Sequence, residues 1–211
     1  TNEDGALWLV FNGEIYNFAL LRAELEAAGV RFRGHSDTEV LVEGIAAWGL
    51  VATLQRAAGM FALAVWDRAG RTLHLARDRF GEKPLYYGRS GGHFLFGSEL
   101  KALRAHPGWQ GRIDRGALSL YFRFNYVPAP FSIYEGIRKL LPGHVASVRE
   151  GHEPSVSPYW SLEDVARAGL ADPLEGSDEE LVALVEDRLR RTIAEEMVAD
   201  VPLGALLSGG I

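Results

Sequence analysis

The chain contains no cysteine and carries more acidic than basic residues. Its 211 residues have a net charge of −6. Without cysteine these residues form no disulfide and no thiolate metal site, and we expect a cytoplasmic protein. The six histidines are scattered singly along the chain, so no metal site is expected either. The acidic balance argues against nucleic acids or an anionic membrane surface as partners.

Long hydrophobic runs are also missing. The longest apolar runs, residues 6–11 and 60–66, are far too short to cross a bilayer, and no charged-then-apolar leader opens the chain. The composition, 47% hydrophobic and 24% charged, is that of an ordinary globular protein with a substantial core. Neither end resembles a natural domain boundary, so we expect the chain to be an excerpt of a longer protein.

Hydrophobic periodicity predicts a strand-rich first part and a helix-then-strand second part. The expected strands are residues 7–11, 60–66, 72–76, 84–87, 93–96 and 144–149, and the expected helices are 18–28, 39–48, 100–105 and 114–122. After residues 159–176, interpreted as a linker, a capping box at Ser177 opens a long amphipathic helix and residues 203–207 form a short strand. This order predicts α+β for residues 1–158 and the beginning of an α/β domain for 177–211.

The most informative segment is Phe11–Asn17 (FNGEIYN), which follows an apolar strand. An Asn-Gly pair between apolar runs is typical of a hairpin turn. Alternatively, the N–H of Gly13 and the amide NH2 of Asn12 form an oxyanion hole, each donor worth a few kcal/mol. Glu14 and Asp37 then bind an ammonium or amide group, although Asp37 or Ser36 equally suits the N-cap of the following helix.

Three further segments have both a structural and a functional interpretation. Arg77–Tyr87 is interpreted as a charged turn, with Arg77 and Asp78 in an ion pair, and Ser98 as the cap of the next helix. The chain closes on a small-residue loop whose N–H groups suit a phosphate, or which is simply a flexible end. The residues of this loop and the strand before it are Leu206, Leu207, Ser208, Gly209 and Gly210.

Taken in order, these segments resemble the glutamine-hydrolysing asparagine synthetases. The resemblance covers nearly the whole chain. Its motifs are Phe11–Asn17, Ser36–Glu39, Arg77–Tyr87, Ser98–Leu103, Leu141–His144, Tyr159–Trp160 and Val201–Gly210.

The resemblance implies a glutaminase domain of the N-terminal-nucleophile hydrolase type, an αββα sandwich of antiparallel sheets, followed by the start of an ATP pyrophosphatase domain. Such enzymes are carbon–nitrogen ligases that use ATP and Mg2+ to activate aspartate, and often dimerise. Ammonia from glutamine then gives asparagine, AMP and pyrophosphate. By position, Asn12 and Gly13 form the oxyanion hole, Glu14 and Asp37 bind glutamine, and residues 206–210 begin the ATP site.

One departure from the family concerns the nucleophile, a cysteine that this chain lacks. Thr1 is not expected to replace it, because it lies only eleven positions before Asn12. We therefore expect the chain alone to be inactive. The alternatives are an amidotransferase acting on another carboxylate, such as a sugar or natural product, one acting on fructose 6-phosphate or phosphoribosyl pyrophosphate, or a non-catalytic binding module.

Overall fold

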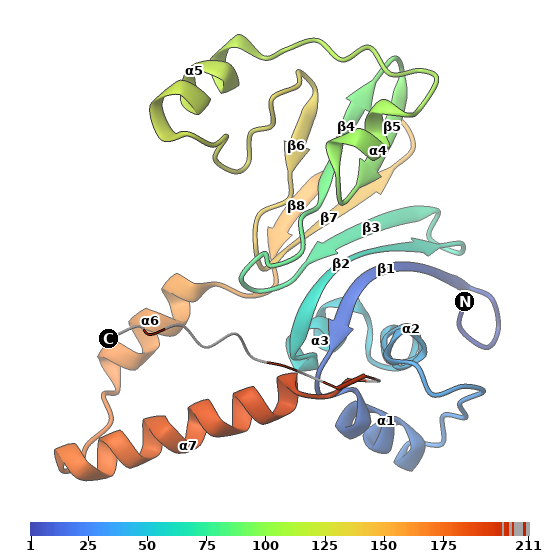
Figure 1. The fold of residues 1–211 in the computed structure, drawn as a ribbon. Coiled ribbons are helices and arrows are strands. Elements are labelled where there is room, and N and C mark those ends of the chain that lie inside the picture. The colour runs from blue at the N-terminus through green and yellow to red at the C-terminus, as the bar shows by residue number, and fades with distance from the viewer. Residues whose placement is uncertain (200, 203, 205–208, 210–211) are drawn as a thin grey trace. The chain divides into compact units, whose positions relative to one another are not determined.

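A computed structural model describes residues 1–199, 201–202, 204 and 209. The chain divides into two compact units, Thr1–Leu162 and Glu163–Ile211. In the first unit a larger and a smaller antiparallel sheet pack face to face, and three helices cover the other face of the larger sheet (Figure 1). The α+β architecture expected for this part is confirmed.

The larger sheet has five strands in the order β1-β2-β3-β7-β8, and the smaller has three in the order β5-β4-β6. All neighbouring strands are antiparallel. The strands are β1 (Leu7–Ile15), β2 (Gly59–Asp67), β3 (Thr72–Arg77), β4 (Tyr86–Ser90), β5 (His93–Gly97), β6 (Ile137–Lys139), β7 (His144–Arg149) and β8 (Ser155–Pro158). Strand β1 is an edge strand, so one side of it pairs with no other strand of the described chain.

Five helices lie within this unit: α1 (Phe18–Ala27), α2 (Asp37–Trp48), α3 (Leu50–Arg56), α4 (Leu100–Arg104) and α5 (Arg115–Phe124). Helix α2 begins where Ser36 Oγ accepts the N–H of Glu39 at 3.2 Å, so Ser36 rather than Asp37 is its N-cap. Leu41 and Ile45, one turn apart, are buried on the same side. The cap and the spacing of apolar residues together explain why this segment is helical.

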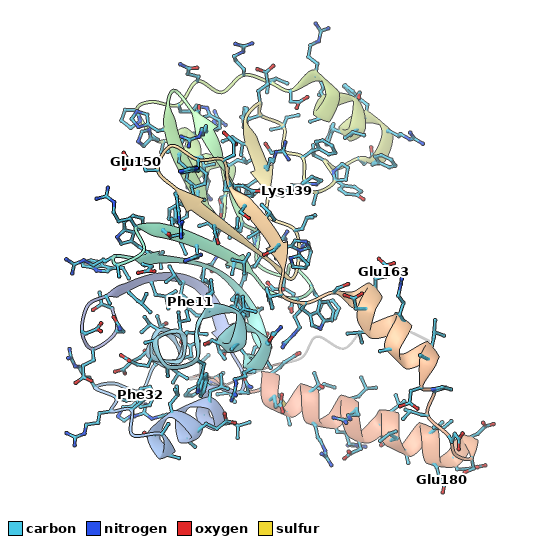
Figure 2. The ribbon with its side chains drawn as sticks, turned by 180° about the vertical axis from the view of Figure 1, so that it is seen from behind. Phe11, Phe32, Lys139, Glu150, Glu163 and Glu180 are labelled. Atoms are coloured by element: carbon cyan, nitrogen blue, oxygen red, sulfur yellow. The ribbon has the colours of Figure 1, made fainter. Side chains whose placement is uncertain are left out.

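Alternate residues of β2 serve two apolar clusters. Phe61, Leu63 and Val65 face the helices, where Phe11 and Phe32 pack at the margin of the cluster (Figure 2). The intervening residues face the smaller sheet. There the buried cluster consists of Ala62, Ala64, Leu75, Leu85, Tyr87, Leu140 and Ala146. The continuous apolar run of β2 is therefore the run of a strand covered on both faces, as its sequence predicts.

The second unit contains α6 (Leu162–Ala171) and α7 (Asp178–Glu196). The predicted capping box opens α7: Ser177 Oγ accepts the N–H of Glu180 at 3.3 Å, and the Glu180 carboxylate accepts the N–H of Ser177 at 2.8 Å. Neither helix buries a residue. Apart from Gly204, the strand expected over 203–207 lies outside the described residues.

Four elements are not expected from the sequence, namely α3, β6, β8 and α6. Helix α6 occupies most of the segment interpreted as a linker. Its apolar residues Leu162, Val165 and Leu170 are all exposed and do not mark a core-facing side. Tyr159, placed in the same linker, is buried in the core and its hydroxyl donates to the carbonyl of Arg77 at 2.9 Å. The division into residues 1–158, 159–176 and 177–211 as domains stays a prediction.

The hairpin-turn interpretation of Asn12-Gly13 is wrong. Strand β1 continues through both residues to Ile15, and its partner β2 follows only after three helices. Within the described ranges no helix is long and apolar enough to span a membrane. No group of three histidine or carboxylate side chains is placed to hold a metal ion in the same part of the chain.

Candidate active site

The candidate site lies where the end of β1 meets the start of α2. Asp37 is the first residue of α2, and its Oδ2 accepts the N–H of Ile15 at 3.1 Å. Its Oδ1 accepts the N–H of Thr38 at 2.6 Å. The structure thus brings Asp37 beside Asn12-Gly13-Glu14, as the sequence motifs suggest, although the two segments are separated by helix α1.

Only glycine fits at position 13. A Cβ built there would lie 2.1 Å from the carbonyl oxygen of Met60 on β2. Gly59 shows the reciprocal close approach, since its Cβ would lie 2.1 Å from the carbonyl oxygen of Glu14. The backbones of β1 and β2 therefore converge at this end of the sheet, and a side chain at either position would push the strands apart.

The N–H of Gly13 is directed to the free edge of the sheet. The N–H of Ile15 points away from β2 and donates to the carboxylate of Asp37. Because N–H directions along a strand repeat every second residue, the N–H of Gly13 lies on the same edge. No strand of the described chain pairs there. This edge consequently offers a main-chain donor to a bound molecule.

The side chain of Asn12 lies beside this donor. It is exposed, and its Nδ2 donates to Ser98 Oγ at 2.9 Å. Since a carboxamide NH2 carries two hydrogens, one remains for a ligand. The expectation that Ser98 caps the next helix is wrong: the N-cap of α4 is Glu99, and no side chain bonds there. The Asn12–Ser98 contact joins residues 86 apart, so no local pattern indicates it.

Two half-buried carboxylates, Glu14 and Asp37, accompany the two donors. Paired donors suit a carbonyl oxygen that gains negative charge during attack. Carboxylates suit an ammonium group on the same molecule. The arrangement fits a compound that carries both a carbonyl and an ammonium group, but the chain supplies no cysteine to attack it.

The Arg77–Tyr87 segment stabilises the strand that pairs with the site. Asp78 is 1% exposed, and its carboxylate accepts four main-chain N–H groups at 2.9–3.1 Å, those of Phe61, Phe80, Glu82 and Lys83. Arg77 donates instead to the carbonyls of Gly81, Lys83 and Leu140. The turn interpretation is confirmed, but the expected Arg77–Asp78 ion pair does not form. Since Phe61 is the register partner of Gly13, Asp78 fixes the strand on which the site rests.

Thr1 lies at the wrong end of β1 to act as a nucleophile. The next residue, Asn2, exchanges hydrogen bonds with Leu7 at the start of the strand, at 2.9 and 3.3 Å. From Leu7 to Gly13 six extended residues span about 20 Å. The structure therefore supports the expectation that Thr1 does not act as the nucleophile.

Comparison with known proteins decides the family. Residues 1–160 match the family described as glutamine amidotransferase domain. The chain belongs to this family. Residues 184–211 match a second family, described as asparagine synthase. The donors and carboxylates at the edge of β1 thus lie within the part of the chain that matches the amidotransferase domain.

Curated relatives are much longer than this chain. Asparagine synthetase [glutamine-hydrolyzing] 3 of Bacillus subtilis is 36% identical over 204 residues, which cover 96% of this chain and 32% of that protein. Amidase chry2 of Gibberella zeae is 32% identical over 213 residues, covering 100% of this chain and 30% of the relative. The chain therefore spans about a third of the length of the curated relatives it matches.

A solved structure confirms the fold of the amidotransferase domain. Glutamine phosphoribosylpyrophosphate amidotransferase from Bacillus subtilis superposes with a TM-score of 0.53 at 23% identity, over 77% of this chain and 30% of that one. The expected N-terminal-nucleophile sandwich is confirmed at the level of fold. Of the residues expected to begin an ATP site, Leu206, Leu207, Ser208 and Gly210 lie outside the described residues, and only Gly209 is described.

Proposed function

We propose that this chain carries the glutamine site of a glutamine-hydrolysing asparagine synthetase. The observation that supports it most is the meeting of Asn12, Gly13 and Asp37 at the free edge of β1. That edge lies in the part of the chain that matches the glutamine amidotransferase domain. The α-ammonium group of glutamine binds Glu14 and Asp37, and its side-chain carbonyl oxygen points to Asn12 and Gly13.

The two donors act when the amide is attacked. A thiol contributed from outside these residues adds to the amide carbon, and the carbonyl oxygen takes up negative charge. The Asn12 NH2 and the Gly13 N–H stabilise that oxyanion, an effect of about 10²–10³ in rate for a single donor. Collapse of the adduct releases ammonia and leaves a thioester, which water hydrolyses to glutamate. Ser98 holds the Asn12 carboxamide through the 2.9 Å hydrogen bond.

The match of residues 184–211 to asparagine synthase extends the proposal to the acceptor. When bound, ATP with Mg2+ would supply an adenylated aspartate carboxyl group, with release of pyrophosphate, and attack of ammonia on that carboxyl carbon would displace AMP. We assign residues 1–158 to the glutaminase domain, 159–176 to a linker and 177–211 to the start of the synthetase domain, with residues 206–210 opening the ATP site. The enzyme is proposed to be a cytoplasmic homodimer with no nucleic-acid or membrane partner.

The complete gene product in which this chain lies tests the proposal. With glutamine, aspartate, ATP and Mg2+ it should form asparagine, AMP and pyrophosphate in equal amounts, and residues 1–211 alone should form none. Ammonia release without amidation of aspartate would favour another carboxylate acceptor, since one relative is named an amidase. A gene product that neither hydrolyses nor transfers glutamine nitrogen would favour a binding module and contradict the proposal.

A further inference from the structure

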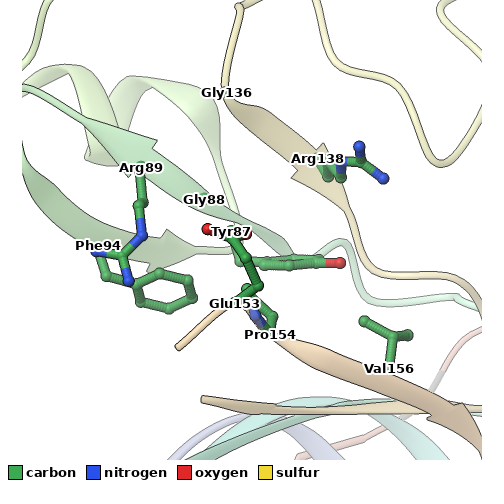
Figure 3. Close-up of a pocket in the computed structure, with 9 residues that line it drawn as sticks. All are labelled: Tyr87, Gly88, Arg89, Phe94, Gly136, Arg138, Glu153, Pro154 and Val156. Carbon is green, nitrogen blue, oxygen red and sulfur yellow. The ribbon is translucent and has the colours of Figure 1, made fainter. Parts of the chain in front are cut away.

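A cavity opens in the first unit, away from the candidate glutamine site. It has a volume of about 420 Å³ and lies between the smaller sheet and the segment that leads into β8 (Figure 3). This volume falls within the range of small-molecule sites. None of its lining residues belongs to β1 or α2, so it is separate from the edge that carries Asn12 and Asp37.

The buried residue of this cavity is Tyr87 on β4, which is 7% exposed. Its hydroxyl bonds to no group of the described chain. In the described chain every fully buried side-chain oxygen or nitrogen has a hydrogen-bond partner. An oxygen without a partner is therefore accessible, and because Tyr87 lines the cavity, its hydroxyl opens into it. The phenol is protonated at neutral pH and can donate, and burial raises the pKa of Tyr87 further in that direction. Buried tyrosine hydroxyls usually have a partner, and here the cavity is where a ligand would provide one.

Arg138 adds a positive charge beside this hydroxyl. It is the register partner of Tyr87 across β4 and β6, and its charge opposes the rise of the tyrosine pKa. Figure 3 shows its guanidinium on the side to which the Tyr87 hydroxyl points. Arg138 forms no ion pair with any described residue. A guanidinium without an ion-pair partner and a phenol O–H without an acceptor can together donate hydrogen bonds to a carboxylate.

The other charged groups give the cavity a second pole. Arg89 is already engaged: it lies 6.0 Å from the ring centre of Phe94 and donates to the carbonyl of His152 at 3.3 Å. Glu153 lines the cavity and has no ion-pair partner within the described chain. It would repel a simple anion and attract an ammonium group. The other large side chains of the lining, those of Phe94, Pro154 and Val156, are apolar.

We propose that this cavity binds a small zwitterion of the α-amino-acid type with an apolar side chain. Its carboxylate bonds to Arg138 and to the Tyr87 hydroxyl, its ammonium group faces Glu153, and its side chain packs on Phe94 and Val156. All three kinds of lining group are then used by one ligand. The proposal is independent of the glutamine site at β1.

Calorimetric titration of the protein with three matched compounds tests this site. L-Phenylalanine carries both charges, 3-phenylpropionate only the carboxylate and 2-phenylethylamine only the ammonium. Phenylalanine should bind at least about tenfold more tightly than either of the others, because each charge-assisted contact is worth about tenfold or more. Failure of phenylalanine to bind saturably, or equal binding of 3-phenylpropionate, would overturn the proposal.

Variants locate the binding. Arg138→Gln should weaken phenylalanine about tenfold, Tyr87→Phe should weaken it several-fold while keeping the buried ring, and Glu153→Gln should abolish the preference over 3-phenylpropionate. Arg104→Gln, at an exposed arginine outside the cavity, and Asp37→Asn, at the glutamine site, should bind as the unmodified protein does. Wild-type affinity in both Arg138→Gln and Glu153→Gln, with folding verified by circular dichroism, would contradict the assignment.

Discussion

Helices α2 and α7 begin in the same way but differ in what they bury. Each starts at a serine whose hydroxyl accepts the N–H of the residue three positions later, and each repeats apolar residues at helical spacing. In the first unit Leu41 of α2 is completely buried, whereas in the second Leu189 of α7 is 57% exposed. A cap and a periodic pattern therefore suffice to specify a helix, but its contribution to stability requires a layer to pack against.

The largest contrast is expected between two aspartates. Asp78→Ala removes a buried carboxylate that satisfies four N–H groups, and should lower the free energy of unfolding of the first unit by about 4 kcal/mol. Asp187→Ala removes only a surface partner of Arg191 in α7 and should change it by less than about 0.5 kcal/mol. Urea denaturation followed by tryptophan fluorescence measures both. Equal effects would mean that Asp78 does not stabilise the turn that follows β3.

Two leucines give the next contrast. Leu41→Ala creates a cavity under α2 and should cost about 3 kcal/mol of unfolding free energy. Leu189→Ala, on the exposed side of α7, should cost less than about 0.5 kcal/mol in the same chain. The same denaturation measurement applies. A large loss for Leu189→Ala would show that α7 buries this side chain in solution.

The helix caps should differ least. Ser36→Ala removes the bond to the Glu39 N–H and should lower the unfolding free energy by about 1 kcal/mol. Ser177→Ala breaks the capping box of α7, and because α7 buries no residue it should lower helical circular dichroism without moving the main transition. Threonine, whose hydroxyl can also cap, should retain most of the stability at position 36 and most of the helical signal at position 177. A shift of the main unfolding transition by Ser177→Ala would show that α7 unfolds cooperatively with the first unit.

Local patterns predicted much of the first unit. A continuous apolar run predicts β2, a polar capping residue predicts the start of α2 and a turn before an apolar segment predicts the returning strand β3, and the structure confirms each. Elements without such patterns were missed. Strand β6 has three residues, and α6 exposes its apolar residues, so neither shows a core-facing repeat.

The candidate site was predicted in its residues but not in its geometry. The grouping of Asn12-Gly13 with Asp37 followed from the chemistry of these residue types and from a family resemblance, not from spacing. The need for glycine at position 13 arises from the close approach of Met60, which lies on a strand far along the chain. The Asn12–Ser98 bond and the Asp78 network likewise depend on contacts that only folding creates.

The rate of ammonia release from glutamine by the complete gene product tests the central claim most directly. Asn12→Ala removes one of the two proposed oxyanion donors, and kcat should fall about 10²–10³-fold with little change in KM. Arg104→Gln, at an exposed arginine of α4, should leave both constants unchanged. An Asn12→Ala enzyme that retains the kcat of the unmodified protein would contradict the assignment of this edge of β1 as the glutamine site.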